Sequence, residues 1–209
     1  MLRFRFLFTL FTFLLASHSI SAQTTNKDTI VLLNGNVVVC DVIDTTNGVT
    51  SVRNPKNEKK NIIIENDRIF SIKNASGESI MYVYDTVIGN EFTIDEMRYF
   101  IYGEADADKH FKGNGAMILN GVLGVASGVT GSFLCPIPPF AFAALSGLPK
   151  VKIKHSTVSN LEYLKQPAYL LGYERVARKK RKIRSLLSGG IGLGVGLGTF
   201  YVLDKNKIF

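Results

Sequence analysis

The feature that most constrains this chain is a long stretch without any charged side chain. Residues 115–148 form 34 consecutive positions that contain no Asp, Glu, Lys, Arg or His, and a second uncharged run covers residues 185–203. A helix at the surface of a soluble protein keeps a polar face, whereas a helix of about 20 apolar residues spans the hydrocarbon core of a bilayer. The sequence therefore predicts an α+β membrane protein with apolar membrane segments at 113–149 and 185–204.

The first uncharged run contains prolines, which break helices, so it does not predict one simple crossing. Pro136, Pro138 and Pro139 fall in its second half, and residues 139–148 are too few for an independent span. They could form a re-entrant turn, a kinked continuation or a short returning helix. The run therefore predicts either one net crossing or a hairpin.

The positive charge of the chain is concentrated just before the second uncharged run. The net charge is +8, but residues 22–113 carry ten Lys/Arg against fourteen Asp/Glu, while residues 150–184 carry eleven Lys/Arg against two Asp/Glu. The basic residues nearest the second run are Arg175, Arg178, Lys179, Lys180, Arg181, Lys182 and Arg184. Basic residues near a membrane end favour the cytoplasmic side and attract lipid phosphate.

This charge bias favours one net crossing with the basic loop in the cytoplasm, whereas a hairpin would leave that loop outside. Clustered cations also bind nucleic acid without sequence preference. A nucleic-acid partner is not favoured here, because topology and lipid explain a basic run that adjoins an apolar segment. The bilayer is the expected partner.

Glycines recur on helical faces of both uncharged runs. Small residues on one face let membrane helices approach closely and pack through dispersion. The positions expected to pack are Gly121, Gly124, Gly128 and Gly131 in the first run and Gly190, Gly194 and Gly198 in the second. Gly192 and Gly196 form another row on the last helix. Two glycine faces predict contacts between helices, either within the chain or between copies.

The first 22 residues have the features of a signal peptide. Arg3 and Arg5 precede an apolar stretch at 6–16, and Ser21-Ala22 offers small residues for cleavage. An uncleaved N-terminal anchor is the alternative. Export would place the following region outside the cytoplasm. We therefore expect a cell-envelope membrane, the inner one, with the soluble part on the periplasmic side.

Residues 23–90 predict a small β module. Two β-branched runs, at 30–33 and 37–43, flank Asn34-Gly35-Asn36, which is typical of a hairpin. Further short runs between turn residues extend the count to five or six strands. Short strands at this spacing predict a barrel-like or curled sheet.

The hydrophobic period then changes to that of a helix. Thr93 can cap a helix whose first turn is acidic. We expect an amphipathic linking helix at 91–112, which docks on the β module or lies at the membrane surface and could break at Gly103.

The basic region 150–184 is expected to contain a juxtamembrane helix before the C-terminal one. Asn160 or Gln166 can start this helix, and Pro167 suits its first turn. Tyr169 and Tyr173 share a face, and aromatic rings suit the level of the lipid headgroups.

Short motifs in the β region and beyond it resemble those of one protein family. They are the run from Asp28 to Ile43, the strand from Asp67 to Ile72, the stretch 97–104 and Gly172-Tyr173 ahead of the basic run. On these motifs the chain is similar to uncharacterised exported proteins of Bacteroidetes-type bacteria, in which a β module precedes glycine-rich membrane helices. The resemblance implies the same order of parts here and carries no activity with it.

No residue pattern predicts an enzyme. His110 and His155 are the only histidines beyond the first 22 residues, and no zinc-protease, zinc-finger or serine-hydrolase motif is present. Cys40 lies in an apolar strand, which favours an inert buried thiol. We therefore expect a non-enzymatic envelope protein that presents its β module for binding or assembly, without cofactor or metal. Its partner would be a second copy or another envelope protein.

Two alternatives stay open. The glycine rows could build a self-associating transport or pore component. An enzyme could instead use the carboxylates between Glu104 and Asp108 for acid–base chemistry. His110 follows Asp106 and Asp108 and could complete a crude metal cluster, although a solvated helix face is the simpler interpretation.

Overall fold

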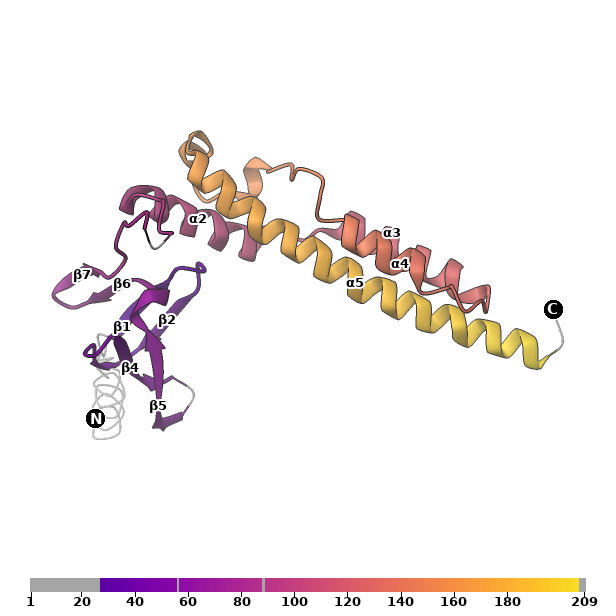
Figure 1. The fold of residues 1–209 in the computed structure, drawn as a ribbon, viewed down its shortest axis with the longest axis horizontal. Helices are drawn as coiled ribbons and strands as arrows, with labels where there is room; N and C mark the ends of the chain where they lie inside the picture. Colours follow the sequence, from indigo (N-terminus) through magenta and orange to yellow (C-terminus); the bar gives the residue numbers. More distant parts are fainter. Residues whose placement is uncertain (1–26, 56, 88, 207–209) are drawn as a thin grey trace, which may run out of the picture.

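The computed structural model describes residues 27–55, 57–87 and 89–206, which are arranged as a β region, a helical junction and a long helical arm (Figure 1). The predicted signal peptide lies outside the described residues. The strands gather at one end of the molecule, and the longest helix, α5 (Pro167–Lys205), runs from the junction to the opposite end. The chain is thus α+β, with its strands in the N-terminal part.

The first sheet is antiparallel and has the order β2-β1-β6-β7. Its strands are β1 (Asp28–Leu32), β2 (Val37–Cys40), β6 (Ile69–Asn74) and β7 (Gly77–Ile80). The β1–β2 hairpin turns at Asn34-Gly35, where the sequence predicts it, and pairs Val31 with Val37. Gly35 has φ +75°, a conformation that a residue without Cβ adopts at no steric cost.

The second sheet is also antiparallel, and it does not join the first into a barrel. Its strands are β3 (Val42–Asp44), β4 (Val49–Asn54) and β5 (Asn57–Glu65), in the order β3-β4-β5. The chain bends at Asp41, so the single strand expected at 37–43 is divided between the two sheets. Both sheets stay open in the described part of the chain, which corrects the prediction of a barrel-like module. Ile30, Val52 and Ile69 are fully buried between them.

α2 (Ile94–His110) begins at a capping box and continues through Gly103. The Thr93 backbone N–H donates to Glu96 Oε2 at 2.9 Å, and the Glu96 N–H donates to Thr93 Oγ1 at 3.3 Å. Gly103 does not break the helix. Its missing side chain instead allows α2 and α5 to pack closely. A Cβ at Gly103 would overlap the carbonyl oxygen of Tyr169 on α5.

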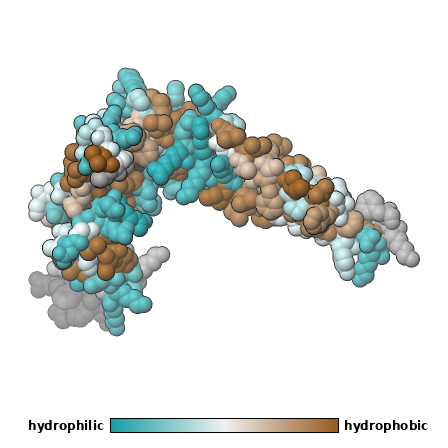
Figure 2. Space-filling model, in the orientation of Figure 1, coloured by the Kyte–Doolittle hydropathy of each residue, from teal (hydrophilic) through white to brown (hydrophobic). Residues whose placement is uncertain are grey.

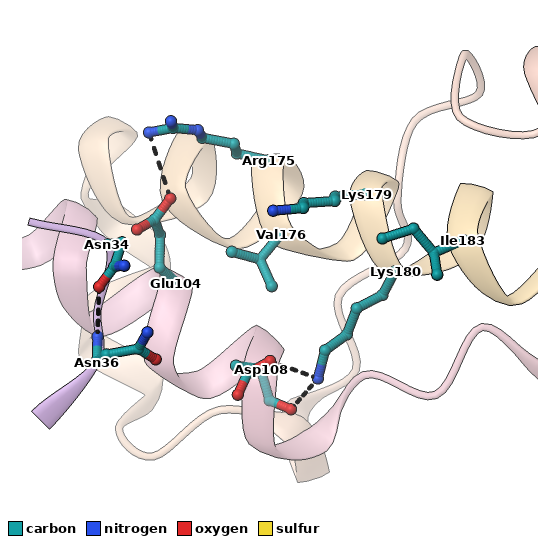
Figure 3. Close-up of a pocket in the computed structure, with 9 residues that line it drawn as sticks. All are labelled: Asn34, Asn36, Glu104, Asp108, Arg175, Val176, Lys179, Lys180 and Ile183. Carbon is teal, nitrogen blue, oxygen red and sulfur yellow. Dashed lines mark hydrogen bonds and ion pairs between the residues drawn. The ribbon is translucent and has the colours of Figure 1, made fainter.

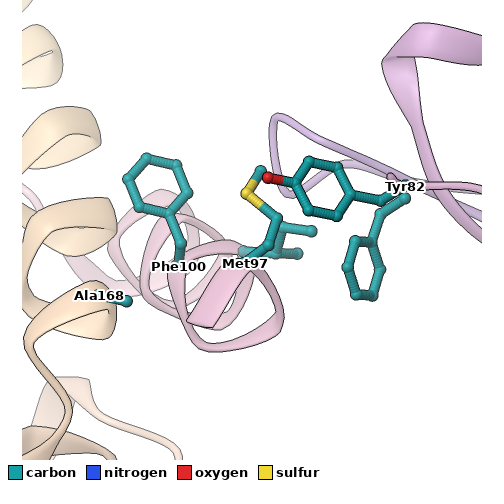
Figure 4. Close-up of a cluster of buried hydrophobic side chains, with 6 residues drawn as sticks. Tyr82, Met97, Phe100 and Ala168 are labelled. Carbon is teal, nitrogen blue, oxygen red and sulfur yellow. The ribbon is translucent and has the colours of Figure 1, made fainter. Parts of the chain in front are cut away.

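α2 connects the β region to α5 through one apolar cluster (Figure 4). The cluster consists of Phe70, Tyr82, Met97, Phe100, Ile101 and Ala168. Figure 4 shows Tyr82 approaching Met97 of α2 from the strand side, while Phe100 faces Ala168 at the start of α5. Tyr82 also donates its hydroxyl to the Phe92 carbonyl at 2.8 Å. The β region is therefore fixed to the helices by a packed core.

The arm consists of three helices, and α3 (Asn114–Val129) runs in the same direction as α5. Gly113, before α3, lies against Arg181, whereas Gly131, after α3, lies against the ring of Phe200. Both helices therefore lead away from the junction toward the far end of the molecule, as Figure 1 shows.

α4 (Ile137–Leu145) returns toward the junction. Pro139 packs near Gly189, while Gly147, beyond the end of α4, packs near Lys182. Residues 113–149 thus form a hairpin, whereas the charge pattern favoured one net crossing. Local features permit this reversal, because Gly131 has φ +59° and the prolines at 136, 138 and 139 end the first helical direction.

α5 is one continuous helix of 39 residues, about 58 Å long at 1.5 Å per residue. The predicted juxtamembrane helix and C-terminal helix are its two halves. Pro167 stands at the first turn, where its missing N–H leaves no hydrogen bond unmade. Two short 3₁₀ turns, η2 (His155–Thr157) and η3 (Leu161–Lys165), lie between α4 and α5.

Candidate functional site: the base of the apolar arm

The arm presents apolar side chains to its surroundings (Figure 2). We define the apolar arm as residues 114–148 together with 185–205, and its base as the part of the molecule around residues 175–184 of α5, from which the arm extends. Its exposed large hydrophobic residues include Ile118, Leu119, Val122, Phe133, Leu134, Ile137, Phe140, Leu145, Leu187, Ile191, Val195, Tyr201 and Val202. Phe133, at the tip, is 94% exposed. Soluble monomers rarely expose contiguous apolar patches of this extent.

Within the described residues, α5 is the one helix that is long and apolar enough to cross a membrane. α3 is a shorter apolar helix. This candidate span weakly indicates association with a membrane.

Some of the predicted glycines form the contact between α3 and α5. A Cβ at Gly124 would overlap the carbonyl oxygen of Gly189, and one at Gly128 would come within 2.7 Å of the carbonyl oxygen of Leu193. A Cβ at Gly121 would stand 3.8 Å from Ser188, which is an ordinary contact, so the packing is looser there. The two helix backbones thus meet with no side chain between them.

The α5 side of this contact is a different row from the one singled out in the sequence. Gly192 and Gly196 face α3, and a Cβ at either would overlap a backbone carbonyl oxygen of that helix. Gly190, Gly194 and Gly198 have open space where a Cβ would stand. All three are exposed, so this row lies on the outside of the arm.

A buried amide joins all three helices of the arm, and sequence reasoning missed it. Asn120 of α3 is fully buried and donates its Nδ2 to the Pro139 carbonyl at 3.0 Å and to the Ser185 carbonyl at 2.8 Å. In an apolar surrounding an unmade hydrogen bond is costly, so this pair of bonds favours one arrangement of the helices. The available signal was a lone Asn in an uncharged helix.

At the base, two of the predicted basic residues hold the ends of the hairpin. Arg181 donates to the Ser146 carbonyl at 3.3 Å and to the Pro149 carbonyl at 3.0 Å, and Arg184 donates to the Lys112 carbonyl. Both ends of the hairpin are therefore tied to the same part of α5. Arg181 and Arg184 therefore have a structural role inside the protein, in addition to any effect of their charge on membrane topology.

The other predicted basic residues divide into paired and unpaired ones. Ion pairs join Arg175 to Glu104 at 3.5 Å, Arg178 to Glu174 at 2.8 Å and Lys180 to Asp108 at 2.8 Å.

Lys179 and Lys182 differ from these three. Neither side chain makes an ion pair or a hydrogen bond with any residue that the structure describes. They are the two basic residues at the base that form no ion pair within the described residues, although the Lys179 charge acts through space on the Glu104 carboxyl group.

A pocket of about 340 Å³ lies at the base, where the β1–β2 turn, α2 and α5 meet (Figure 3). It is lined by Asn34, Asn36, Glu104, Asp108, Arg175, Val176, Lys179, Lys180 and Ile183. Figure 3 shows Glu104 turned toward Arg175, and Lys179 lying along α5 with its nitrogen on the side of Arg175 and Glu104.

Glu104 is the most unusual group in this pocket. It is 3% exposed, and its Oε2 has no hydrogen-bond partner among the described residues. Burial raises the pKa of this carboxyl group above its ordinary value of 4.5, and the nearby Arg175 and Lys179 offset part of that rise.

The neighbouring Asp106 has a structural role. It accepts hydrogen bonds from the Ser159 N–H at 2.9 Å, from the Ser159 hydroxyl and from the Tyr169 hydroxyl at 2.7 Å. These bonds fix the segment before α5 onto α2. Asp106 and Asp108 thus face different partners.

No group of three or more His, Cys, Asp or Glu residues that could hold a metal ion is found in the described ranges. Cys40 and Cys135 are both buried and free. Burial also raises the pKa of the Cys40 thiol, with smaller contributions from Asp28 and Asp41, and a raised pKa disfavours the reactive thiolate.

Comparison with protein-family models, with curated proteins and with solved structures gives no match to this chain. The resemblance to exported envelope proteins therefore stays a prediction from the sequence.

Proposed function

We propose that this protein is a non-enzymatic membrane protein of the cell envelope that holds a small β module at the membrane surface. The observation that carries the proposal is the apolar arm. Its outer face is made of side chains that water solvates poorly, and lipid tails solvate such side chains well. The β region and the arm are joined by packed cores, so the module would stand in a fixed position above the bilayer.

The hairpin gives this proposal a definite topology. Both ends of residues 113–149 lie at the base, beside α2 and the basic residues of α5, while Asn206 lies beyond the far end of the arm. The β module and the segment 150–166 would therefore share one side of the membrane, with the C-terminal end of α5 on the other. With the expected signal peptide, the side that the β module and the segment 150–166 share is outside the cytoplasm. The basic residues of α5 would then lie outside as well, although basic residues usually favour the cytoplasmic side.

Cysteine accessibility in intact cells tests this topology. In a background with Cys40→Ser and Cys135→Ser, single cysteines replace Thr45 on the β module, Ser156 before α5, or Asn206. All three positions are exposed. We expect a membrane-impermeant maleimide to label the Thr45 and Ser156 variants alike and to leave the Asn206 variant unlabelled until the membrane is opened. Opposite labelling of Thr45 and Ser156 would refute the hairpin and restore the single crossing.

Self-association is a second candidate function, and the open glycine row favours it. A glycine inside a helix costs about 1 kcal/mol relative to alanine. Gly190, Gly194 and Gly198 recover none of this cost through packing inside the described chain. A helix of a second copy could approach there, which is the basis for an assembly that lines a transport path.

Two substitutions to leucine separate the outer row from the inner one. Gly194→Leu should not lower the melting temperature in detergent, because a Cβ there meets open space, but it should remove crosslinked dimers and larger species. Gly192→Leu should destabilise the arm itself, since its side chain would displace the α3 backbone. Unchanged crosslinking of the Gly194→Leu protein would exclude this interface.

A further inference from the structure

A second hollow adjoins the Glu104 pocket at the base, on the side that faces the arm. It has a volume of about 630 Å³ and is lined by Gly147, Leu148, Arg175, Arg178, Lys179, Lys182 and Ile183. Arg175, Lys179 and Ile183 also line the Glu104 pocket, so the two hollows are neighbours. We call the second hollow the basal groove. Its side chains are apolar at Leu148 and Ile183 and cationic around them.

The unpaired lysines of the base both belong to this groove. Lys179 and Lys182 are three positions apart on α5, so their side chains share one face of the helix. They stand about 9 Å and 4.5 Å before Ser185, where the uncharged half of α5 begins. If that half occupies the hydrocarbon core, the two ammonium groups stand at the level of the lipid headgroups.

The wall of the groove is shaped to place Lys182. Gly147 follows α4, and a Cβ at this position would overlap the methylene stem of Lys182. The absence of a side chain at Gly147 lets that stem lie across the end of the hairpin. Because Gly147 has no side chain, the groove also stays open next to Leu148.

The charge of the groove favours one class of ligand. Arg175 and Arg178 form ion pairs with Glu104 and Glu174, whereas Lys179 and Lys182 form none with the described residues. The Lys179 charge does favour the ionised form of Glu104, but the two groups do not form an ion pair. An anionic group would pair with both lysines. The apolar side chains beside them lead toward the exposed apolar surface of the arm, so the complementary ligand has an anionic head and a hydrocarbon tail.

We propose that the basal groove binds an anionic phospholipid, whose phosphate contacts Lys179 and Lys182 and whose acyl chain lies along Ile183 and Leu148. This inference rests on the proposed function, because it requires the arm to stand in a bilayer. It adds a defined lipid site to a general membrane anchor. The bound lipid would fix the depth of α5 and hence the distance of the β module from the membrane.

Lipid binding to the full chain in a neutral detergent tests the site. Native mass spectrometry counts the retained phosphatidylglycerol, phosphatidylcholine and glycerol 3-phosphate. The charge variant is Lys179→Gln/Lys182→Gln. The matched control is Lys150→Gln/Lys152→Gln, which removes the same charge from exposed positions outside the groove. Gly147→Leu fills the groove without changing its charge.

We expect the charge variant to bind phosphatidylglycerol at least tenfold more weakly, since each lysine near a lipid surface contributes about 1 kcal/mol. The control should stay within about twofold, given that its lysines lie outside the groove. Gly147→Leu should also weaken binding. The melting temperature without lipid shows whether each variant is folded. If Gly147→Leu does not fold, the comparison of the two lysine double variants decides the result.

Several outcomes would overturn the inference. Equal losses in the two lysine pairs would assign the effect to general surface charge. Equal binding of phosphatidylcholine would remove the selectivity, and equally tight glycerol 3-phosphate would indicate a site for a free anion. A chain that stays out of membranes altogether would instead refute the proposed function. A chain that integrates with the expected labelling but shows no selectivity would refute this inference alone.

Discussion

At the scale of single residues, two buried polar side chains have the largest expected effect on the stability of this protein. Glu104 and Asn120 are both buried, and each leaves one side-chain oxygen without a hydrogen bond among the described residues. The free-energy cost of burying the Asn120 amide is offset by its two hydrogen bonds, which join the arm helices. Glu104 has one ion pair among the described residues, with Arg175, whose side chain is 69% exposed, so solvent weakens that pair.

The raised pKa of Glu104 predicts a specific dependence of stability on pH. In the window from its ordinary pKa of 4.5 up to its raised folded value, the folded protein holds this proton more tightly than the unfolded chain. The contribution of Glu104 to stability therefore falls as pH rises through that window and is constant below it. Glu104→Gln mimics the protonated form. We expect its melting temperature in detergent to exceed that of the wild type by about 2–4 °C near neutral pH.

The difference between Glu104→Gln and wild type should disappear below pH 4.5, where both side chains are neutral. Glu65→Gln is the control, because Glu65 is an exposed glutamate on β5. Glu65→Gln should change neither the melting temperature nor the dependence of the melting temperature on pH. A Glu104→Gln protein that is less stable than wild type near neutral pH would show that the Arg175 pair outweighs the cost of burying the charge.

At the scale of helices and strands, periodicity and turn chemistry predict where elements lie but not which faces meet. The Asn34-Gly35 turn and the Thr93 cap are local signals, because the residues that form them are neighbours in sequence. The choice between the two glycine rows of α5 is not local. It depends on where α3 lies, and both rows have the same composition and a spacing of four residues.

The direction of the chain after α3 shows the same limit. The three prolines predict a break, but a break is compatible with a bend or a reversal. The left-handed Gly131, the bonds of Asn120 to α4 and α5, and the bonds of Arg181 to the end of the hairpin together select the reversal. The last two involve residues up to 65 positions apart, so no short window of sequence contains them.

At the scale of the whole molecule, α5 links a packed, partly polar end to an apolar end. Its first half packs on α2 and the segment 150–166, whereas its second half packs on the glycines of α3 and on α4 and exposes apolar side chains elsewhere. A single helix of 39 residues that changes its surroundings halfway fits a boundary between water and lipid. The basic residues gather at that change.

A charge placed in the middle of the arm gives the sharpest test of that boundary. Val195 is 55% exposed and stands about 15 Å beyond Ser185, near the centre of a bilayer if α5 crosses it. Val195→Lys should cost about 2.5–3.5 kcal/mol of insertion free energy and lower the carbonate-resistant membrane fraction severalfold. Val195→Leu should leave that fraction unchanged, and so should Thr45→Lys on the β module. If Val195→Lys instead matches wild type while the chain stays monodisperse in plain buffer, the arm is covered by protein, and lipid is not its solvent.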